Sequence, residues 1–449
     1  MKHRFPENFK WGVSTASYQI EGGAREGGRG ETIWDRFSDV PGNIEDGCTG
    51  EIACDHYHRW REDVQLMKQM GIQVYRFSIA WSRVYPEGCG AVNEEGLKFY
   101  SDLVDELLAN GIEPCITLYH WDLPQALQDR GGWANRDSAQ WFADYCRTVF
   151  ERLGGRVKMW ITLNEPWVSC FEGLAYGHFA PGHRDFSEAL LAVHNELRGH
   201  GMAVRIFREM KLPGEIGIVL SLSPKEPATG SEADRLAAWR DDGNANRWFL
   251  DPVFKGGYPE DMKAFYRSKG IRLPKEHAGD MELIAEPVDF LGVNNYYVEF
   301  AREDKSVWPM EFSTVIPREE YRVTNYDWPV IPRGLRDLLV RLDREYDHPK
   351  LYITENGASY LDVKNLDGEV IDDQRLDYIR QHIMACHEAI EQGANLCGYF
   401  VWSLFDNFEW NTGFKNGFGL VYVDRPSRDR TIKKSGKWYR TVIERNGLE

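Results

Sequence analysis

Short apolar runs alternate with longer amphipathic stretches along the chain. The runs are of strand length and are bounded by glycine, proline or polar residues, which is typical of parallel strands buried on both faces. They lie at residues 10–16, 73–80, 114–119, 159–163, 216–221, 290–294, 351–354 and 398–403. The pattern therefore predicts eight buried strands.

Between these runs, apolar positions recur at helical spacing and predict amphipathic helices. The longest such stretches are residues 56–70, 94–110, 138–153, 187–210, 334–346 and 372–392. Asp55 and Ser187 stand where an N-cap is expected, and Gly71, Gly111 and Gly393 stand where a helix should stop. Helical material thus follows the predicted strands along the chain.

Eight strands that lead into helical material are the count of a closed parallel barrel. We expect an α/β protein with a single (β/α)8 TIM barrel over residues 1–449 and an active site at the C-terminal ends of its strands. No low-complexity segment, charge block or linker divides the sequence. An open doubly wound sheet is the structural rival, but the sequence lacks a Gly-rich dinucleotide fingerprint.

The charge balance narrows the choice of partners. With 54 basic against 70 acidic residues, the net charge is −16, so we expect neither nucleic acid nor an anionic membrane surface as a partner. Residues 1–10 contain no apolar leader, and no run of about 18 apolar residues indicates a membrane span. The expected partner is a small molecule, with homo-oligomerisation left open.

Cysteine and histidine spacing gives no sign of a metal centre. The eight cysteines are scattered without zinc-like spacing, which favours reduced thiols in a cytoplasmic protein. His56 and His58 stand two apart at a predicted helix start and point in different directions. We therefore expect no metal and no cofactor.

Two short strings each place one glutamate directly after a predicted strand. They are Thr-Leu-Asn-Glu-Pro at 162–166 and Ile-Thr-Glu-Asn-Gly at 353–357, with the glutamates Glu165 and Glu355. A carboxyl pair held at strand ends suits acetal hydrolysis, in which one group protonates the leaving group while the other faces the cation-like carbon. Two unrelated surface glutamates are the alternative, which a shared barrel disfavours.

Further polar and aromatic residues follow other predicted strands, and a barrel brings all these ends to one rim. Taken singly, Arg76 is compatible with a buried ion pair and His120 with a hydrogen-bonded core histidine. Their convergence with the two glutamates favours a functional site. The residues expected at this rim are Gln19, Arg76, His120, Trp121, Asn164, Glu165, Tyr296, Glu355, Glu409 and Trp410.

Longer strings make a resemblance to one known family specific. They are Phe-Lys-Trp-Gly at 9–12, Ser-Tyr-Gln-Ile-Glu-Gly at 17–22, Tyr-Arg-Phe-Ser-Ile at 75–79, Tyr-His-Trp-Asp-Leu-Pro at 119–124, Phe-Leu-Gly-Val-Asn at 290–294 and Trp-Ser-Leu-Phe-Asp-Asn-Phe-Glu-Trp at 402–410. Over essentially its whole length the chain resembles β-glucosidases of glycoside hydrolase family 1. The resemblance implies a retaining enzyme that releases terminal non-reducing β-D-glucosyl residues from β-glucosides and short cello-oligosaccharides through a covalent glycosyl-enzyme.

The resemblance also implies roles for individual residues. Glu165 would be the general acid/base and Glu355 the nucleophile. The remaining members of the implied catalytic set are Arg76, Tyr296 and Asn294, with Tyr297 as the less favoured alternative to Tyr296. The implied substrate-binding set is Gln19, His120, Trp121, Asn164, Trp167, Trp402, Glu409, Trp410 and Phe418, with Trp328 on the leaving-group side.

Elementary electrostatics gives the two glutamates different requirements. In a retaining enzyme their carboxyls stand roughly 5–5.5 Å apart. Glu355 must be ionised to attack, and Arg76 and Tyr296 suit that state by charge and by hydrogen bond. Glu165 must begin protonated, so burial and the neighbouring Glu355 charge should raise its pKa.

Several alternatives within the same fold stay open. A 6-phospho-β-glucosidase needs cationic groups near O6, where Glu409 would repel phosphate and Lys415 is the one contrary sign. A β-galactosidase or β-fucosidase differs only in how the sugar hydroxyls are held. A thioglucosidase or a non-catalytic sugar-binding relative would be expected to lack one of the two glutamates, and both are present.

Overall fold

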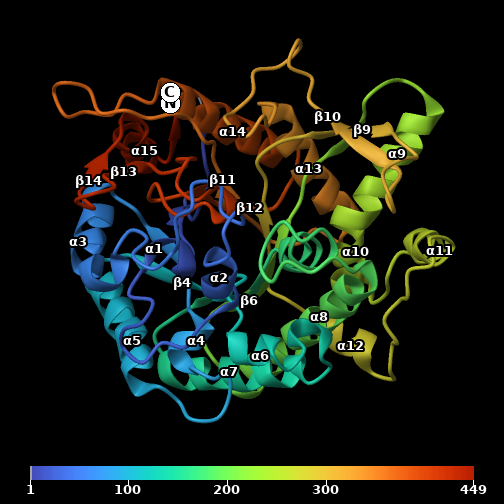
Figure 1. Ribbon diagram of the computed structural model, residues 1–449. Coiled ribbons are helices and arrows are strands. Elements are labelled where there is room, and N and C mark those ends of the chain that lie inside the picture. The colour runs from blue at the N-terminus through green and yellow to red at the C-terminus, as the bar shows by residue number, and fades with distance from the viewer. Residues whose placement is uncertain (1–2) are drawn as a thin grey trace.

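A computed structural model describes residues 3–449. Residues 1–2 lie outside the described residues. They are the first two residues of the expected 1–449 domain and of the 1–10 segment considered above. Within residues 3–449, eight parallel strands close a barrel (Figure 1), which confirms the predicted fold. The strands are β2 (Lys10–Ser14), β3 (Val74–Ser78), β4 (Glu113–Tyr119), β5 (Met159–Asn164), β6 (Glu215–Ser221), β8 (Phe290–Asn294), β11 (Leu351–Asn356) and β12 (Leu396–Trp402).

Every long helix predicted from the sequence is present. These helices are α3 (His56–Gln69), α5 (Glu94–Ala109), α7 (Ser138–Leu153), α8 (Phe186–Glu209), α13 (Pro332–Glu345) and α14 (Asp373–Glu391). Gly71, Gly111 and Gly393 follow their helices with φ of 71°, 74° and 102°, a left-handed conformation that glycine adopts without steric cost. The three predicted stops are therefore confirmed.

The two predicted N-caps turn out differently. Ser187 lies inside the first turn of α8, and the cap is Asp185, whose side chain accepts from the backbone N–H of Ser187 at 2.8 Å. Asp55 does stand at the N-cap of α3, but its carboxylate accepts from His58 Nδ1 at 2.6 Å. The Ser187 prediction was wrong because Asp185, two residues earlier, reaches the same free N–H groups.

Side chains on one face of the strands form an apolar layer in the barrel, followed by a polar layer nearer the C-terminal ends of the strands. Eight buried residues from seven of the strands form one cluster, namely Val74, Cys115, Met159, Ile161, Val219, Phe290, Tyr352 and Phe400. Two positions further along three of these strands, on the same face, stand the buried polar residues Arg76, Thr117 and Thr354. The apolar layer is thus succeeded by hydrogen-bonding groups as each strand approaches its C-terminal end.

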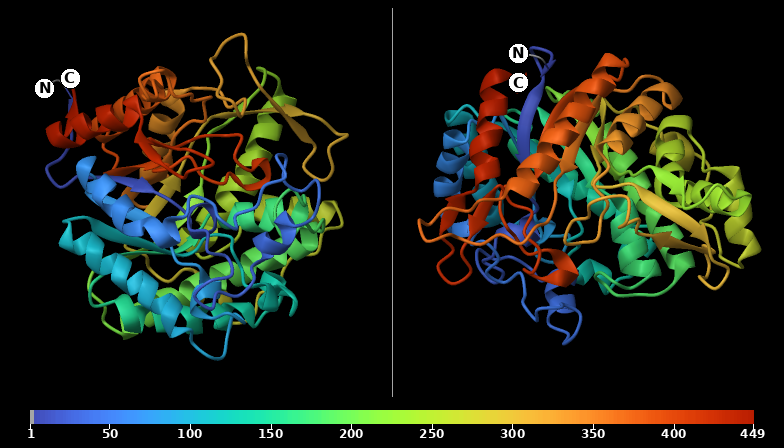
Figure 2. Two further views of the ribbon diagram at one scale, coloured as in Figure 1. Left: turned by 60° about the vertical axis from the view of Figure 1, so that its left-hand side comes forward. Right: turned by 90° about the horizontal axis from the view of Figure 1, so that it is seen from above.

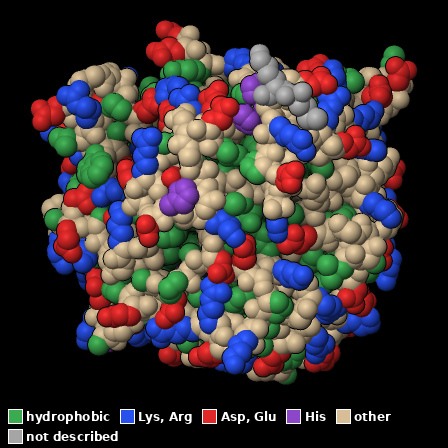
Figure 3. Space-filling model, turned by 180° about the vertical axis from the view of Figure 1, so that it is seen from behind, with side chains coloured by type: hydrophobic (Ala, Val, Ile, Leu, Met, Phe, Trp, Pro, Cys, Tyr) green, Lys and Arg blue, Asp and Glu red, His purple; other side chains and the backbone are tan. Residues whose placement is uncertain are grey.

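Other segments extend the barrel outward. Between β6 and β8 the chain forms α9 (Glu232–Asp242), α10 (Trp248–Lys255), α11 (Glu260–Ser268) and α12 (Asp280–Ile284). A small sheet beside α9 consists of β7 (Lys225–Pro227), β9 (Glu299–Glu303) and β10 (Phe312–Val315). The two chain ends lie together (Figure 2), where β1 (His3–Arg4) pairs with β15 (Gly447–Leu448). On the face shown in Figure 3, acidic and basic side chains are interspersed.

Candidate active site

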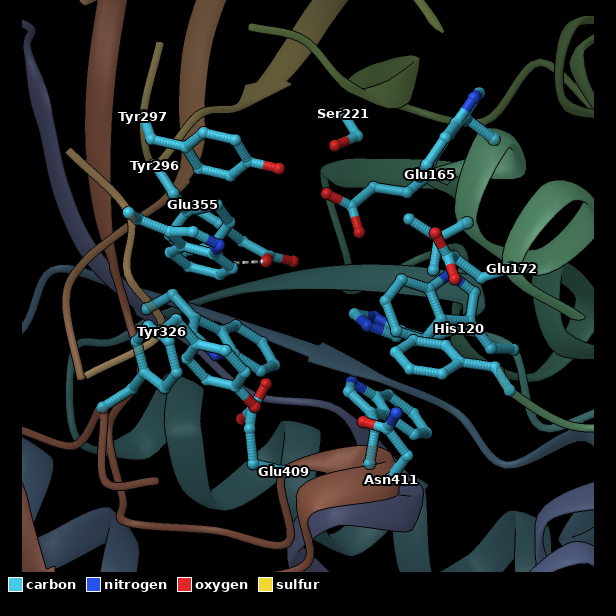
Figure 4. A pocket seen from close by; sticks show the side chains of 18 residues that line it. His120, Glu165, Glu172, Ser221, Tyr296, Tyr297, Tyr326, Glu355, Glu409 and Asn411 are labelled. Atoms are coloured by element: carbon cyan, nitrogen blue, oxygen red, sulfur yellow. Dashed lines mark hydrogen bonds between the residues drawn. The ribbon is translucent and has the colours of Figure 1, made fainter. Parts of the chain in front are cut away.

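A cavity of about 200 Å³ opens where the barrel strands end (Figure 4). His120 follows β4 directly, Ser221 ends β6, and Trp402 ends β12. The cavity is lined by His120, Trp121, Glu165, Trp167, Val168, Glu172, Phe179, Ser221, Tyr296, Tyr297, Tyr326, Trp328, Glu355, Trp402, Glu409, Trp410, Asn411 and Phe418. Aromatic walls with a few polar groups on them are typical of a site for a small polar ligand.

Glu165 and Glu355 face each other across this cavity from opposite sides (Figure 4). Glu165 is the first residue after β5, and Glu355 lies within β11. Their exposed fractions are 4% and 3%. Two carboxyl groups are therefore held almost out of water on strands from different halves of the chain.

Three cavity residues have a left-handed backbone although none is glycine. Glu165, Trp121 and Trp410 have φ of 47°, 73° and 49°. Such conformations cost on the order of 1–3 kcal/mol each and persist where the surrounding structure enforces them. All three line the cavity, so part of the backbone strain of the molecule lies at this site.

Glu355 is anchored through both of its oxygens. Arg76 Nη1 donates to Oε1 at 2.5 Å, and the Tyr296 hydroxyl donates to Oε2 at 2.5 Å. Tyr297, the alternative considered from the sequence, donates to Glu299 at 3.1 Å instead. Burial raises the pKa of Glu355, and the Arg76 charge and the Tyr296 hydrogen bond act against that rise. The net charge of the guanidinium is therefore the main influence that favours the ionised state.

Glu165 lies in a different environment. Burial, and then the charge of Glu355, raise its pKa to about 8. The contact to its Oε2 comes from the neutral amide of Asn164, at 3.3 Å. A group with such a pKa is mostly protonated at neutral pH and can act as a general acid.

A hydrogen-bond network behind the cavity fixes the orientation of Asn164 and His120. Asn164 Oδ1 accepts from Arg76 Nη2 at 2.5 Å and from Asn294 Nδ2 at 3.1 Å. Its amide nitrogen therefore donates toward His120 Nε2, 3.2 Å away. Burial, with the Arg76 charge, lowers the pKa of His120 well below its usual value, which favours a neutral ring. Because Nε2 accepts from the Asn164 amide, the proton of that neutral ring is assigned to Nδ1. Among the described residues, His120 Nδ1 has no partner, which leaves a donor for a ligand.

Gln19 and Glu409 form a second polar pair. Gln19 Nε2 donates to the Phe408 carbonyl at 2.9 Å and lies 3.3 Å from Glu409 Oε2. Within residues 3–449, Gln19 Oε1 has no partner and remains an acceptor. Burial and the Glu355 charge raise the pKa of Glu409 well above its usual value. Lys415 pairs with Glu45 at 2.6 Å and does not line the cavity.

The structure brings the sequence-predicted residues together in two layers. Those that line the cavity are His120, Trp121, Glu165, Trp167, Tyr296, Trp328, Glu355, Trp402, Glu409, Trp410 and Phe418. Those in the hydrogen-bonded layer behind it are Gln19, Arg76, Asn164 and Asn294. The lining residues that the sequence analysis missed are Val168, Glu172, Phe179, Ser221, Tyr326 and Asn411. Of these, Ser221 ends β6, so the expectation that functional residues stand at the ends of barrel strands could have identified it.

The histidine pair near residue 56 has ordinary partners. His56 Nδ1 contacts Asp63 at 2.8 Å, and His58 contacts Asp55 and Glu26. In the part of the chain that the structure describes, no group of three or more His, Cys, Asp or Glu side chains is arranged to hold a metal ion. No helix within residues 3–449 has the length and apolar character needed to cross a membrane.

A parallel barrel with two opposed carboxyls at its strand ends, between aromatic walls, has the architecture of a glycosidase. Residues 1–448 match the glycosyl hydrolase family 1 model. The chain is 48% identical to β-glucosidase A of Acetivibrio thermocellus, with 100% of both chains covered. It is 38% identical to a 6-phospho-β-galactosidase of Clostridium acetobutylicum, covering 98% of this chain and 97% of that one.

Solved structures agree with these matches. The family 1 β-glucosidase from Thermotoga maritima superposes with a TM-score of 0.96 at 47% identity, covering 100% of both chains. That enzyme is also known in complex with deoxynojirimycin. The chain therefore belongs to glycosyl hydrolase family 1 and is a hydrolase, which confirms the family expected from the sequence.

Proposed function

We propose that this family 1 enzyme is a retaining β-glucosidase that removes terminal β-D-glucosyl residues from β-glucosides and short cello-oligosaccharides. The observation that carries the proposal is the opposed pair, with Glu355 held by Arg76 and Tyr296 and Glu165 carrying a raised pKa of about 8. Relatives named β-glucosidase A and 1,4-β-D-glucan glucohydrolase support the substrate class.

In the first step, Glu165 gives its proton to the glycosidic oxygen while a Glu355 oxygen attacks the anomeric carbon. The bond to the leaving group breaks, and the leaving group departs as a neutral alcohol. The sugar is left as an ester of Glu355 with inverted anomeric configuration. Arg76 and Tyr296 favour the ionised Glu355 that this step needs.

The second step reverses these roles. Esterification removes the charge of Glu355, which is one of the two causes that raise the Glu165 pKa. Glu165, now ionised, takes a proton from a water molecule, whose oxygen attacks the anomeric carbon. The ester bond breaks and Glu355 leaves as a carboxylate, so two inversions give net retention.

The unpaired groups of the site are suited to sugar hydroxyls. His120 Nδ1–H supplies a donor and Gln19 Oε1 an acceptor, as expected for O3 and O4 of glucose. Glu409 adds a second carboxyl for O4 and O6, and Asn164, beside the acid, suits the 2-hydroxyl. Trp402 supplies an aromatic face beneath the ring.

The lining of the cavity argues against a phosphorylated substrate, because among the described residues it includes no Lys or Arg side chain that could pair with a phosphate. A 6-phosphate would lie beside Glu409, and the nearby Lys415 is already paired with Glu45. We therefore favour unphosphorylated glucosides over 6-phosphoglucosides, although a 6-phospho-β-galactosidase is among the relatives. Galactosides and fucosides are expected to react more slowly, because an axial O4 meets Glu409 at a different angle.

The proposal extends to organisation and location. We treat residues 1–449 as a single barrel domain, tested by a single cooperative unfolding transition. We propose a cytoplasmic location because the eight cysteines are free thiols, which a reducing compartment preserves. Cell fractionation tests this, and recovery in the secreted fraction would contradict it.

Three measurements test the reaction. Hydrolysis of p-nitrophenyl β-glucoside should far exceed hydrolysis of its 6-phosphate, and NMR should show β-glucose as the first-formed product. An experimental structure should find the two carboxyls roughly 5–5.5 Å apart. First-formed α-glucose, or a separation beyond about 6.5 Å, would rule out retention.

A further inference from the structure

Glu172 lies on the wall of the cavity but has no part in the reaction just described. It belongs to η2 (Val168–Ala175), a π-helix that begins three residues after Glu165. Figure 4 shows Glu172 on the same side of the cavity as Glu165, opposite Glu355. Because Glu165 is the proposed donor to the leaving-group oxygen, the wall beside it faces the leaving group.

The Glu172 carboxylate is held in place by the loop that follows its helix. His178 Nδ1 lies 2.8 Å from Glu172 Oε2, and the backbone N–H groups of His178 and Phe179 donate to the Glu172 carbonyl at 2.9 and 3.1 Å. The Glu172 side chain is 21% exposed. Within the described residues, His178 is the hydrogen-bond partner found for this carboxylate, so its second oxygen remains an acceptor.

Most other residues that line the cavity are aromatic, and Tyr297 and Tyr326 lie on the Glu355 side in Figure 4. Trp167, Phe179 and Trp328 present ring surfaces. The Tyr297 hydroxyl donates to Glu299 at 3.1 Å, and the Tyr326 hydroxyl pairs with Thr412 at 2.8 Å. A carboxylate among rings provides what a pyranose needs, because sugar C–H faces pack on aromatic rings while the hydroxyls hydrogen-bond.

We propose that Glu172 is a specificity-determining residue that accepts hydrogen bonds from the hydroxyls of a sugar in the leaving-group position. The preferred substrates would then be β-glucosides whose leaving group is itself a sugar. This inference rests on the proposed function and names its substrate class more closely. Hydrogen bonds to a charged acceptor are stronger than those between neutral groups, so the carboxylate should discriminate between hydroxylated and plain leaving groups.

The test compares kcat/KM on cellobiose, methyl β-glucoside and p-nitrophenyl β-glucoside. Cellobiose and methyl β-glucoside both release an alkoxide that needs the Glu165 proton, but only cellobiose offers hydroxyls to Glu172. The variants are E172L and E172Q. The matched control is E188Q, which alters another Glu–His pair, with His183 at 3.0 Å, that does not line this cavity.

E172L should lower kcat/KM on cellobiose by about tenfold or more while the other two substrates change by less than about threefold. E172Q, which keeps the shape but loses the charge, should fall between wild type and E172L. E188Q should leave all three values and their ratios unchanged.

Equal losses on all three substrates, or an unchanged cellobiose to methyl glucoside ratio, would overturn the proposal. If E172L does not fold, the ratio for the isosteric E172Q decides by itself. Failure of the proposed function would be recognised separately, because wild type would then not hydrolyse p-nitrophenyl β-glucoside.

Discussion

Replacing Arg76 with methionine is expected to disable the nucleophile while leaving both glutamates in place. The Arg76 side chain is fully buried, and it donates to Glu355 and Asn164 at 2.5 Å each. Methionine has a similar length but no charge. Glu355 would then keep the Tyr296 hydrogen bond but lose the neighbouring positive charge in a buried setting, so its pKa should rise further.

The magnitude follows from the geometry. With N and O 2.5 Å apart, the charge centres lie within about 4 Å, where two unit charges interact by about 4 kcal/mol at an effective dielectric constant of about 20. That energy corresponds to roughly 10³ in rate. We therefore expect kcat/KM at neutral pH to fall by about three orders of magnitude.

The assay is the pH profile of kcat/KM on p-nitrophenyl β-glucoside. Because Glu355 must be ionised, activity rises with pH through its pKa, and the acidic limb of Arg76→Met should move to higher pH. The control is Arg83→Met, which removes another buried arginine, paired with Glu21 at 2.7 Å and away from the cavity. Arg83→Met should lower stability without moving the limb. A loss below about tenfold for Arg76→Met, or an unmoved limb, would refute the role assigned to the guanidinium.

Three further predictions concern the glutamates. Glu165 must be protonated and has a pKa of about 8, so activity on methyl β-glucoside should fall as pH rises through about 8. The leaving group of dinitrophenyl β-glucoside needs no proton, so the pH profile for this substrate should lack the basic limb. For the same reason Glu165→Ala should impair hydrolysis of dinitrophenyl β-glucoside least. Identical basic limbs for both substrates would contradict the assignment of Glu165 as the general acid. Glu355→Ala should abolish turnover, and azide should restore it with α-glucosyl azide as product, whereas the β-azide would exchange the two roles. Glu409→Ser should lower activity on β-glucosides by at least about tenfold, or about 1.4 kcal/mol. A wild-type preference for the 6-phosphorylated glucoside would refute that assignment.

The barrel and the paired glutamates could be predicted because their signals are local. Parallel strands buried on both faces read as short apolar runs, and a functional residue at a strand end, such as Glu165 or His120, is fixed by its distance from that run. Helix ends were less certain. Asp185 and Ser187 are both good capping residues, and the choice between them depends on which side chain meets the first free N–H groups.

The rest of the cavity depends on contacts that sequence spacing does not show. Tyr326 lies between β10 and α13, outside every predicted strand and helix, and its hydroxyl pairs with Thr412, 86 residues further on. Glu172 faces the cavity from a π-helix, whose periodicity differs from the one used to read the sequence. The raised pKa of Glu409 depends on burial and on the charges of Glu355 and Glu165, so it emerges only from the assembled site.

The closed barrel makes this enzyme suited to a split reporter. Glu165 follows β5 in the first half of the chain and Glu355 lies in β11 in the second, so neither half alone contains a working pair. The exposed residues 229–231, between β7 and α9, offer a place to divide the chain. Two such fragments should be inert alone and release a coloured product only when β6 rejoins β8 and β2 rejoins β12. Release of the coloured product would then report an interaction between the two proteins to which the fragments are fused.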